Sequence, residues 1–180
     1  IGLSLVGSEM CIRDRGDALA SAWMHKNKIS SQEFAFNHPG GSLGRKLTIT
    51  VNDVMIPRQK LKSLTETSSV IDVIYQMTFD GIGSCWVNKK NEDLILKGLI
   101  TDGDLRRSLK ENPSNSWGNL KAKDLMTSNP ITIRPETMAI DALNLMERNT
   151  KKPINIIPVT SKDNEFLGFL RLHDLIQRGL

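Results

Sequence analysis

Thr101, Asp102 and Asp104 are the residues whose types and spacing best suit the recognition of a ligand. They lie in the sequence Gly-Leu-Ile-Thr-Asp-Gly-Asp-Leu at residues 98–105, where an apolar strand is expected to end at Thr101 and a helix to begin at once. A carboxylate one helical turn after a hydroxyl suits a phosphorylated ribose, because the carboxylate accepts hydrogen bonds from the sugar diol while the hydroxyl and the first helix amides meet the phosphate. The same pair is also an ordinary helix N-cap with an acidic residue in the first turn, and the spacing alone leaves this alternative open.

The same segment returns 70 residues later (168 minus 98), at residues 168–175, as Gly-Phe-Leu-Arg-Leu-His-Asp-Leu. Arg171 takes the place of the threonine, and Asp174 keeps the carboxylate. We therefore expect this second corner to hold a ribose through Asp174 with a changed phosphate contact. The flanking segments repeat as well, since residues 51–55 are echoed by residues 122–126, so two copies of one unit make up most of the chain.

Apolar periodicity predicts the element order β-α-β-β-α for each copy, over residues 51–111 and 121–180, which is an α/β (α+β) fold. A small three-stranded sheet cannot bury both of its faces alone. The two copies are therefore expected to pack sheet to sheet or helix to helix. This pairing leaves symmetric clefts between the copies, each bordered by one strand-to-helix corner.

Two helices and one strand carry more specific predictions. The first helix of the first copy is expected to be capped by Thr67 or Ser68. In the second copy, a strand is predicted at residues 131–133 and a helix capped by Thr137. The helix of the first copy is expected to bury an apolar stripe with i, i+3, i+4, i+7 spacing, formed by Val70, Val73, Ile74 and Met77.

A second stretch with residues suited to catalysis or anion binding is His-Pro-Gly-Gly-Ser-Leu-Gly-Arg-Lys-Leu at residues 38–47. Its glycines let the backbone bend closely and turn amides toward an anion, and Pro39 stiffens the bend beside His38. His38 is thus a candidate for proton transfer next to a phosphate-bearing ligand. A structural turn whose histidine bonds a nearby carbonyl is the alternative. Helix signals precede the stretch, at residues 17–24 and in the capping-box pair Ser30 and Glu33.

Residues 1–15 differ from the rest of the chain. They show no clear amphipathic period, and they lack the basic region and the small-residue cleavage site of a secretory signal. The segment resembles translated adaptor sequence of the kind found at the ends of assembled environmental fragments. Because the sequence also begins without methionine, we expect the natural protein to extend upstream and exclude these residues from the functional interpretation.

Composition narrows the function classes. Apolar residues form 39% of the chain and charged residues 24%, with a net charge of +4, which is typical of a water-soluble domain and suits phosphorylated ligands. The basic residues are scattered in pairs, so we expect no nucleic-acid partner, and no apolar run is long enough for a membrane span. Cys11 and Cys85 have neither metal-ligand nor disulfide spacing, which indicates a reducing cytoplasm and no metal site. Neither a Walker-type phosphate loop nor a dinucleotide fingerprint is present, and we expect no resident cofactor.

The repeated units resemble a CBS-domain pair through the Asp-hydrophobic-Met segments at residues 53–55 and 124–126 and through residues 98–107. Joined to residues 16–20 and 38–47, the whole is similar to the C-terminal part of the arabinose-5-phosphate isomerase family. The resemblance covers residues 16–180. It implies that residues 16–47 are the terminal helices of a truncated sugar-isomerase (SIS) domain.

That family interconverts ribulose 5-phosphate and arabinose 5-phosphate for Kdo and lipopolysaccharide or capsule synthesis. The resemblance implies that His38 is an active-site histidine and that the acidic base and the phosphate loop lie upstream, so the fragment alone is expected to be inactive. It further implies a homotetramer and a CBS pair that binds an adenine or cytidine nucleotide or a nucleotide-sugar. The expected nucleotide contacts are Thr101, Asp102, Asp104 and Asp174. The alternative is a stand-alone nucleotide-sensing module without catalysis.

Overall fold

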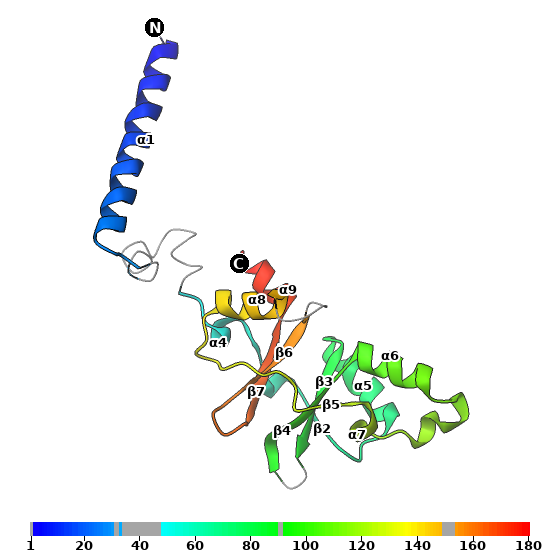
Figure 1. Cartoon of the computed structure of the whole chain (residues 1–180). Coiled ribbons are helices and arrows are strands. Elements are labelled where there is room, and N and C mark those ends of the chain that lie inside the picture. Colours follow the sequence, from blue (N-terminus) through cyan, green and yellow to red (C-terminus); the bar gives the residue numbers. More distant parts are fainter. Residues whose placement is uncertain (1, 31–32, 34–47, 90–91, 149–153) are drawn as a thin grey trace. The chain divides into compact units, whose positions relative to one another are not determined.

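A computed structural model describes residues 2–30, 33, 48–89, 92–148 and 154–180 of the chain (Figure 1). It contains two compact units, Ile1–Thr48 and Ile49–Leu180. None of the helices in the described part of the chain is both long and apolar enough to cross a membrane.

In the first unit, helix α1 (Gly2–Lys26) runs without a break through the segment set apart in the sequence and through the predicted helix that follows it. Leu19 and Trp23 are 72% and 61% exposed, so these two apolar side chains are not buried within the described structure. The predicted capping box is confirmed, because the Ser30 amide and hydroxyl both donate to Glu33 Oε2, at 2.8 and 2.9 Å. His38 and the glycine-rich stretch around it lie outside the described residues.

The second unit contains both repeats. Each begins with a single helical turn and a two-residue strand, and each ends with a strand that turns directly into a helix (Figure 1). The elements of the first repeat are α4 (Val51–Val54), β1 (Ile56–Pro57), the 3-10 turn η1 (Arg58–Lys60), β2 (Ser63–Thr65), α5 (Val70–Asp80), β3 (Ser84–Lys89), β4 (Glu92–Thr101) and α6 (Asp102–Glu111). The 3-10 turn η2 (Ser114–Asn119) links the repeats, and the elements of the second are α7 (Ala122–Leu125), β5 (Thr127–Ser128), α8 (Ala139–Arg148), β6 (Ile156–Thr160), β7 (Phe166–Arg171) and α9 (Leu172–Gln177).

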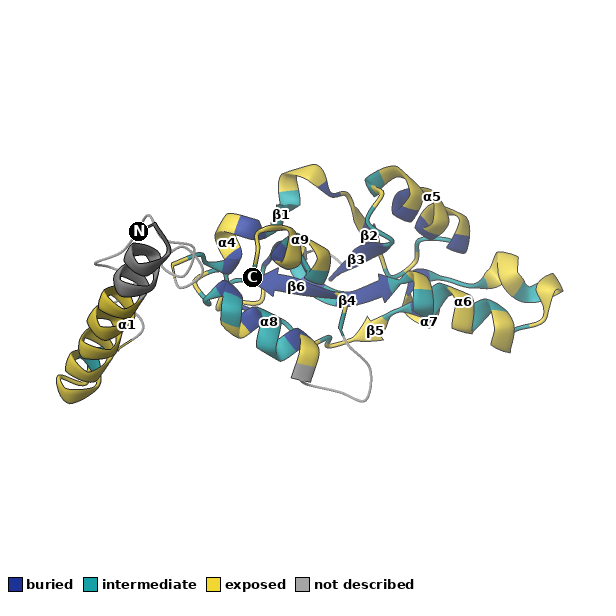
Figure 2. Ribbon diagram, turned by 90° about the horizontal axis from the view of Figure 1, so that it is seen from above, coloured by how far each residue is buried: buried dark blue, intermediate teal, exposed yellow. Residues whose placement is uncertain are grey.

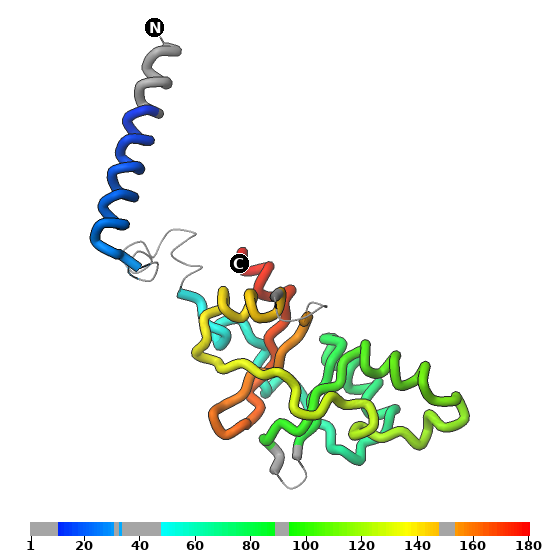
Figure 3. Tube along the Cα trace, viewed as in Figure 1, coloured from blue at the N-terminus to red at the C-terminus, as the bar shows by residue number. Residues whose placement is uncertain are grey.

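The two repeats exchange their first strands. One sheet has the order β2-β3-β4-β5 and the other the order β1-β7-β6, so each repeat completes the sheet of its partner. Strand β5 pairs antiparallel with β4, with Gly98 opposite Ser128, and β1 pairs with β7, with Gly168 opposite Pro57. Figure 3 shows the chain passing between the repeats along the yellow segment after β5.

The first helical turns are exchanged as well. Val51 and Val54 of α4 are buried in the core of the second repeat, and Ala122 and Leu125 of α7 are buried in the core of the first. The backbone bonds of the two exchanges match each other: Val51 N–H donates to the Thr137 carbonyl and Ala122 N–H to the Ser68 carbonyl, both at 2.9 Å. Neither core is complete without a segment from the other repeat, so the two halves are expected to fold as one unit.

The sheets pack face to face, which is one of the two arrangements that the sequence predicted. Trp86 of β3 stacks on Phe166 of β7 with ring centroids 4.3 Å apart, and Phe169 meets Phe166 edge to face. Asn164 ties the hairpins together, since its Nδ2 donates to the Leu96 carbonyl at 3.0 Å. The strands thus form the buried centre of the unit, and the helices have exposed outer faces (Figure 2).

Several local predictions are corrected. The helix of the first copy is capped by Ser69, not by Thr67 or Ser68. Ile74 is 43% exposed, whereas Gln76 is buried and its Nε2 donates to Asp80 Oδ1 at 2.7 Å.

The strand predicted at residues 131–133 is reduced to one bridge between Ile133 and Val159, since Pro130 and Pro135 flank it and cannot donate to a ladder. Helix α8 begins at Ala139, two residues after Thr137.

Candidate functional site

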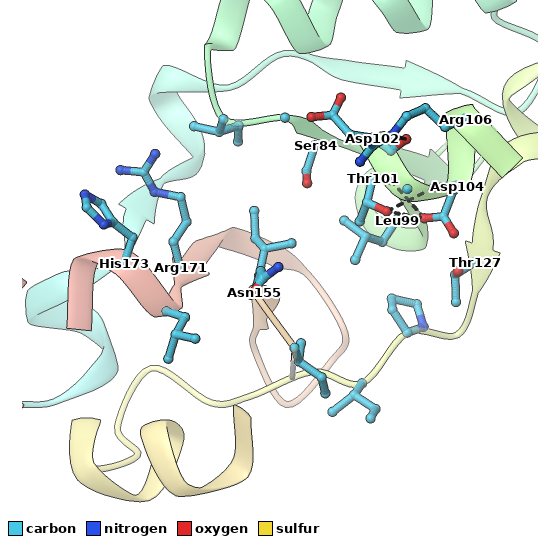
Figure 4. Close-up of a pocket in the computed structure, with 18 of the residues that line it drawn as sticks. Ser84, Leu99, Thr101, Asp102, Asp104, Arg106, Thr127, Asn155, Arg171 and His173 are labelled. Carbon is cyan, nitrogen blue, oxygen red and sulfur yellow. Dashed lines mark hydrogen bonds between the residues drawn. The ribbon is translucent and has the colours of Figure 1, made fainter. Parts of the chain in front are cut away.

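A cleft of about 1040 Å³ lies between the two repeats. The end of β4 and the first turn of α6 form one side, and the end of β7 with the first turn of α9 forms the other (Figure 4). Two segments of the second repeat complete the wall: the loop after β5 and the residues before β6. The exchange of strands therefore brings both strand-to-helix corners to one cavity.

Thr101 and Asp104 make a full capping box at the first corner. The Thr101 amide and hydroxyl donate to Asp104 Oδ2 at 2.9 and 2.7 Å, and the Asp104 amide donates back to the hydroxyl at 3.3 Å. Among the described residues, Asp104 Oδ1 accepts a hydrogen bond from Arg107 Nη1 alone, at 3.2 Å. Arg107 is 64% exposed, so a ligand hydroxyl can replace or join this contact at little cost. The pair is thus an N-cap that also presents a carboxylate oxygen to the cleft.

Asp102 lies beside this pair because Gly83 leaves room for it. The Asp102 amide donates to the Gly83 carbonyl at 3.0 Å, and a Cβ on Gly83 would be 2.6 Å from Asp102 Oδ2. Gly83 also has φ +64°, a conformation that L side chains rarely adopt. Sequence reasoning missed Gly83 and Ser84 as cleft residues. The Gly-x-Gly spacing at residues 81–83 was the available signal.

The charges and surfaces of the first cleft suit an anion joined to a flat apolar group. Three arginines line it, Arg106, Arg107 and Arg171, together with the acidic residues Asp102 and Asp104. Arg106 is held to the start of α6 by a bond of 3.2 Å from its Nε to the Asp102 carbonyl. Apolar side chains, two of them well exposed, line the remaining wall: Ile82, Pro130, Ile131, Ile154 and Ile176.

Asp174 lies in a different cavity. It lines a second cleft of about 370 Å³, together with α4, β1 and the end of α9. Its two carboxylate oxygens accept from Arg171 Nε and Nη2, at 2.8 and 2.6 Å. The hydrogen bond with Asp174 raises the pKa of Arg171. The two predicted corners are therefore unlike: Thr101, Asp102 and Asp104 share the first cleft, and Asp174 is clamped by an arginine in the second.

Outside these clefts the described residues offer few reactive groups. No group of three or more His, Cys, Asp or Glu residues within the described ranges is placed to hold a metal ion. Cys85 is buried, and burial raises the pKa of its thiol to about 12, which makes it unreactive at neutral pH.

Curated relatives match along the chain. The arabinose 5-phosphate isomerase KdsD of Escherichia coli strain K12 is 34% identical over 180 residues, which is all of this chain and 52% of the relative. The corresponding protein of Francisella tularensis is 36% identical over 165 residues, or 92% of this chain and 48% of the relative. The chain thus spans about half the length of the curated relatives it matches.

Solved structures resemble the second unit. The CBS-pair protein CBSX2 from Arabidopsis thaliana has a TM-score of 0.59 and 28% identity, covering 72% of this chain and 93% of that one. A structure of CBSX2 in complex with AMP gives 0.58 and 28%, covering 72% and 95%. The family model of the CBS domain matches residues 51–111 and 122–180, the two repeats described above. The chain belongs to the CBS domain family, and its two repeats form a CBS pair.

Proposed function

We propose that the first cleft binds an adenine nucleotide and that residues 49–180 form a regulatory nucleotide-sensing module. The observation that carries the proposal is the union of Asp104, three arginines and an apolar wall in one cavity of about 1040 Å³. Asp104 Oδ1 accepts from the ribose diol, the arginines neutralise the phosphate, and the isoleucine wall covers the base. The AMP complex of CBSX2, at 28% identity, supports this choice of ligand.

We further propose that the chain is the C-terminal part of an arabinose 5-phosphate isomerase, acting on a sugar phosphate in Kdo and lipopolysaccharide synthesis in the cytoplasm. The match to the KdsD proteins over the whole chain supports this. Residues 16–47 then form the end of the SIS domain, with His38 in its active site, and the exposed Leu19 and Trp23 of α1 pack against the rest of that domain. The free thiol of Cys85 fits a reducing compartment.

The second candidate is a stand-alone CBS pair that senses a nucleotide for a partner protein. It is favoured by the fact that unit 49–180 has complete cores of its own. Sequencing upstream of the fragment separates the two candidates, since an SIS half with an acidic base in the same reading frame supports the isomerase. A chain that begins directly at α1 contradicts it. The isomerase proposal also entails a homotetramer, which sedimentation of the complete protein tests.

Calorimetric titration of the 180-residue chain with AMP, ATP and CMP-Kdo tests the nucleotide site. Asp104→Ala removes a charged hydrogen bond, which corresponds to a loss of affinity of about tenfold or more. It also removes a helix cap, so the matched control is Asp72→Ala, which breaks the equivalent capping box of Ser69 on α5 and leaves the cleft intact. Equal affinities in Asp104→Ala and Asp72→Ala would contradict the assignment. The competing ligands distinguish adenine from cytidine preference.

A further inference from the structure

The second cleft differs from the first in the side chains that remain free to meet a ligand. Its apolar lining residues are already used, because Val54 and Met55 pack in the core of the second repeat and Ile56 packs between the sheets. The first cleft has exposed isoleucines for a base, and the second offers none. Its volume of about 370 Å³ is at the lower end of the range for ligand pockets.

The charged groups of the second cleft are mostly cationic. Lys60 of η1, Arg171 of β7 and Arg178 after α9 line it against one carboxylate, that of Asp174. Asp174 occupies two of the five N–H donors of Arg171, and no other bond of this guanidinium is found among the described residues. Arg178 is held over the cleft by a bond of 3.4 Å from its Nη2 to the Asp53 carbonyl.

We propose that the second cleft is a site for a small phosphate, either free phosphate or the phosphate of a sugar monoester, and not a second nucleotide site. Arg171 in place of threonine converts the ribose corner into an anion corner: Asp174 fixes the guanidinium and no longer serves a sugar diol. Lys60 and Arg178 supply the remaining positive charge from two other elements. The two cavities share Arg171, so the inference rests on Lys60 and Arg178, which line only the second cleft.

Nuclear magnetic resonance of the full 180-residue chain tests the site, with inorganic phosphate, ribose 5-phosphate and AMP as probes at constant ionic strength. Phosphate and ribose 5-phosphate are expected to shift the Nε–H signals of Arg171 and Arg178. Lys60→Gln and Arg178→Gln are each expected to raise the dissociation constant of these probes roughly fivefold. Lys110→Gln is the control, since this exposed lysine on α6 lines neither cleft.

Unchanged phosphate affinity in both Lys60→Gln and Arg178→Gln would overturn the proposal, as would displacement of the phosphate by AMP from the Arg178 signal, since Arg178 lines only the second cleft. Tighter binding of ribose 5-phosphate than of phosphate supports a sugar monoester as the occupant. Equal binding supports free phosphate. AMP binding to Asp104→Ala is measured in a separate titration. If the nucleotide site proves wrong, the phosphate titration of the second cleft can therefore still be interpreted.

Discussion

Gly98 and Gly168 occupy equivalent positions in the two repeats, yet substitution to alanine is expected to have unequal effects. Each glycine faces the strand that crosses over from the other repeat. A Cβ on Gly98 would meet the side chain of Met126, with the sulfur 2.6 Å away. A Cβ on Gly168 would collide with the backbone carbonyl of Ile56 and reach Pro57 Cα at 3.2 Å.

The size of each effect follows from what must move. A thioether can change rotamer, so Gly98→Ala is expected to cost under about 1 kcal/mol of folding free energy. The backbone of β1 cannot move without breaking its pairing with β7, so Gly168→Ala is expected to cost about 1–3 kcal/mol. Both variants lose similar chain entropy in the unfolded state, and the difference between them therefore isolates the crossing contact.

Urea unfolding of the two variants, followed by circular dichroism, measures this difference. The midpoint of Gly168→Ala is expected well below that of the wild type, with Gly98→Ala between the two. If Gly98→Ala is destabilised as much as Gly168→Ala, or if Gly168→Ala unfolds like the wild type, the exchange of strands as described is wrong.

Four further predictions concern the cysteines, Asp53, Trp117 and the isomerase reaction. Exposed Cys11 should react with a disulfide reagent in the native chain. Burial raises the pKa of the Cys85 thiol to about 12, so Cys85 should react only after unfolding. Fast reaction of both thiols in the native chain would contradict the burial of Cys85. Hydrogen bonds from the Thr50 hydroxyl and amide lower the pKa of Asp53, so its stabilising effect is present above about pH 4, the unfolded-state pKa, and is lost as the pH falls through the lower folded-state pKa. The stability difference between wild type and Asp53→Asn should accordingly shrink in acid, and a constant difference would contradict this. Trp117 Nε1 donates to the Leu109 and Asn112 carbonyls at the end of α6, at 3.2 and 2.9 Å, so Trp117→Phe should lower the unfolding free energy by about 1 kcal/mol while the control Trp23→Phe leaves it unchanged. The purified chain should not isomerise ribulose 5-phosphate, because the resemblance places the base and the phosphate loop of the isomerase outside it; measurable turnover in a coupled assay would refute this.

The corner at Thr101 was predictable because its determinants are local. A threonine and an aspartate three residues apart specify a capping box wherever an apolar strand precedes them, and the structure has that box. The duplication was predictable for the same reason, since residues 98–105 and 168–175 have similar sequences. Packing of the two copies against each other followed from the need to cover an apolar face, but the sequence left open whether sheets or helices would meet.

The exchange of α4 and β1 for α7 and β5 was beyond the reach of sequence periodicity. Strands of two residues and helices of four are too short to show a period, and the core that they enter is decided by contacts distant in sequence. The hydrogen bonds between Arg171 and Asp174 were likewise not predictable, because they depend on side-chain geometry. The sequence indicated a changed phosphate contact, and the structure shows that both carboxylate oxygens of Asp174 accept from Arg171.

A crystal structure of the chain with AMP tests the nucleotide assignment most directly. AMP is expected to bind in the first cleft, with a ribose hydroxyl within hydrogen-bond distance of Asp104 Oδ1 and the phosphate beside the arginines of that cleft. AMP bound in the second cleft against Asp174, or a ribose without contact to Asp104, would contradict it.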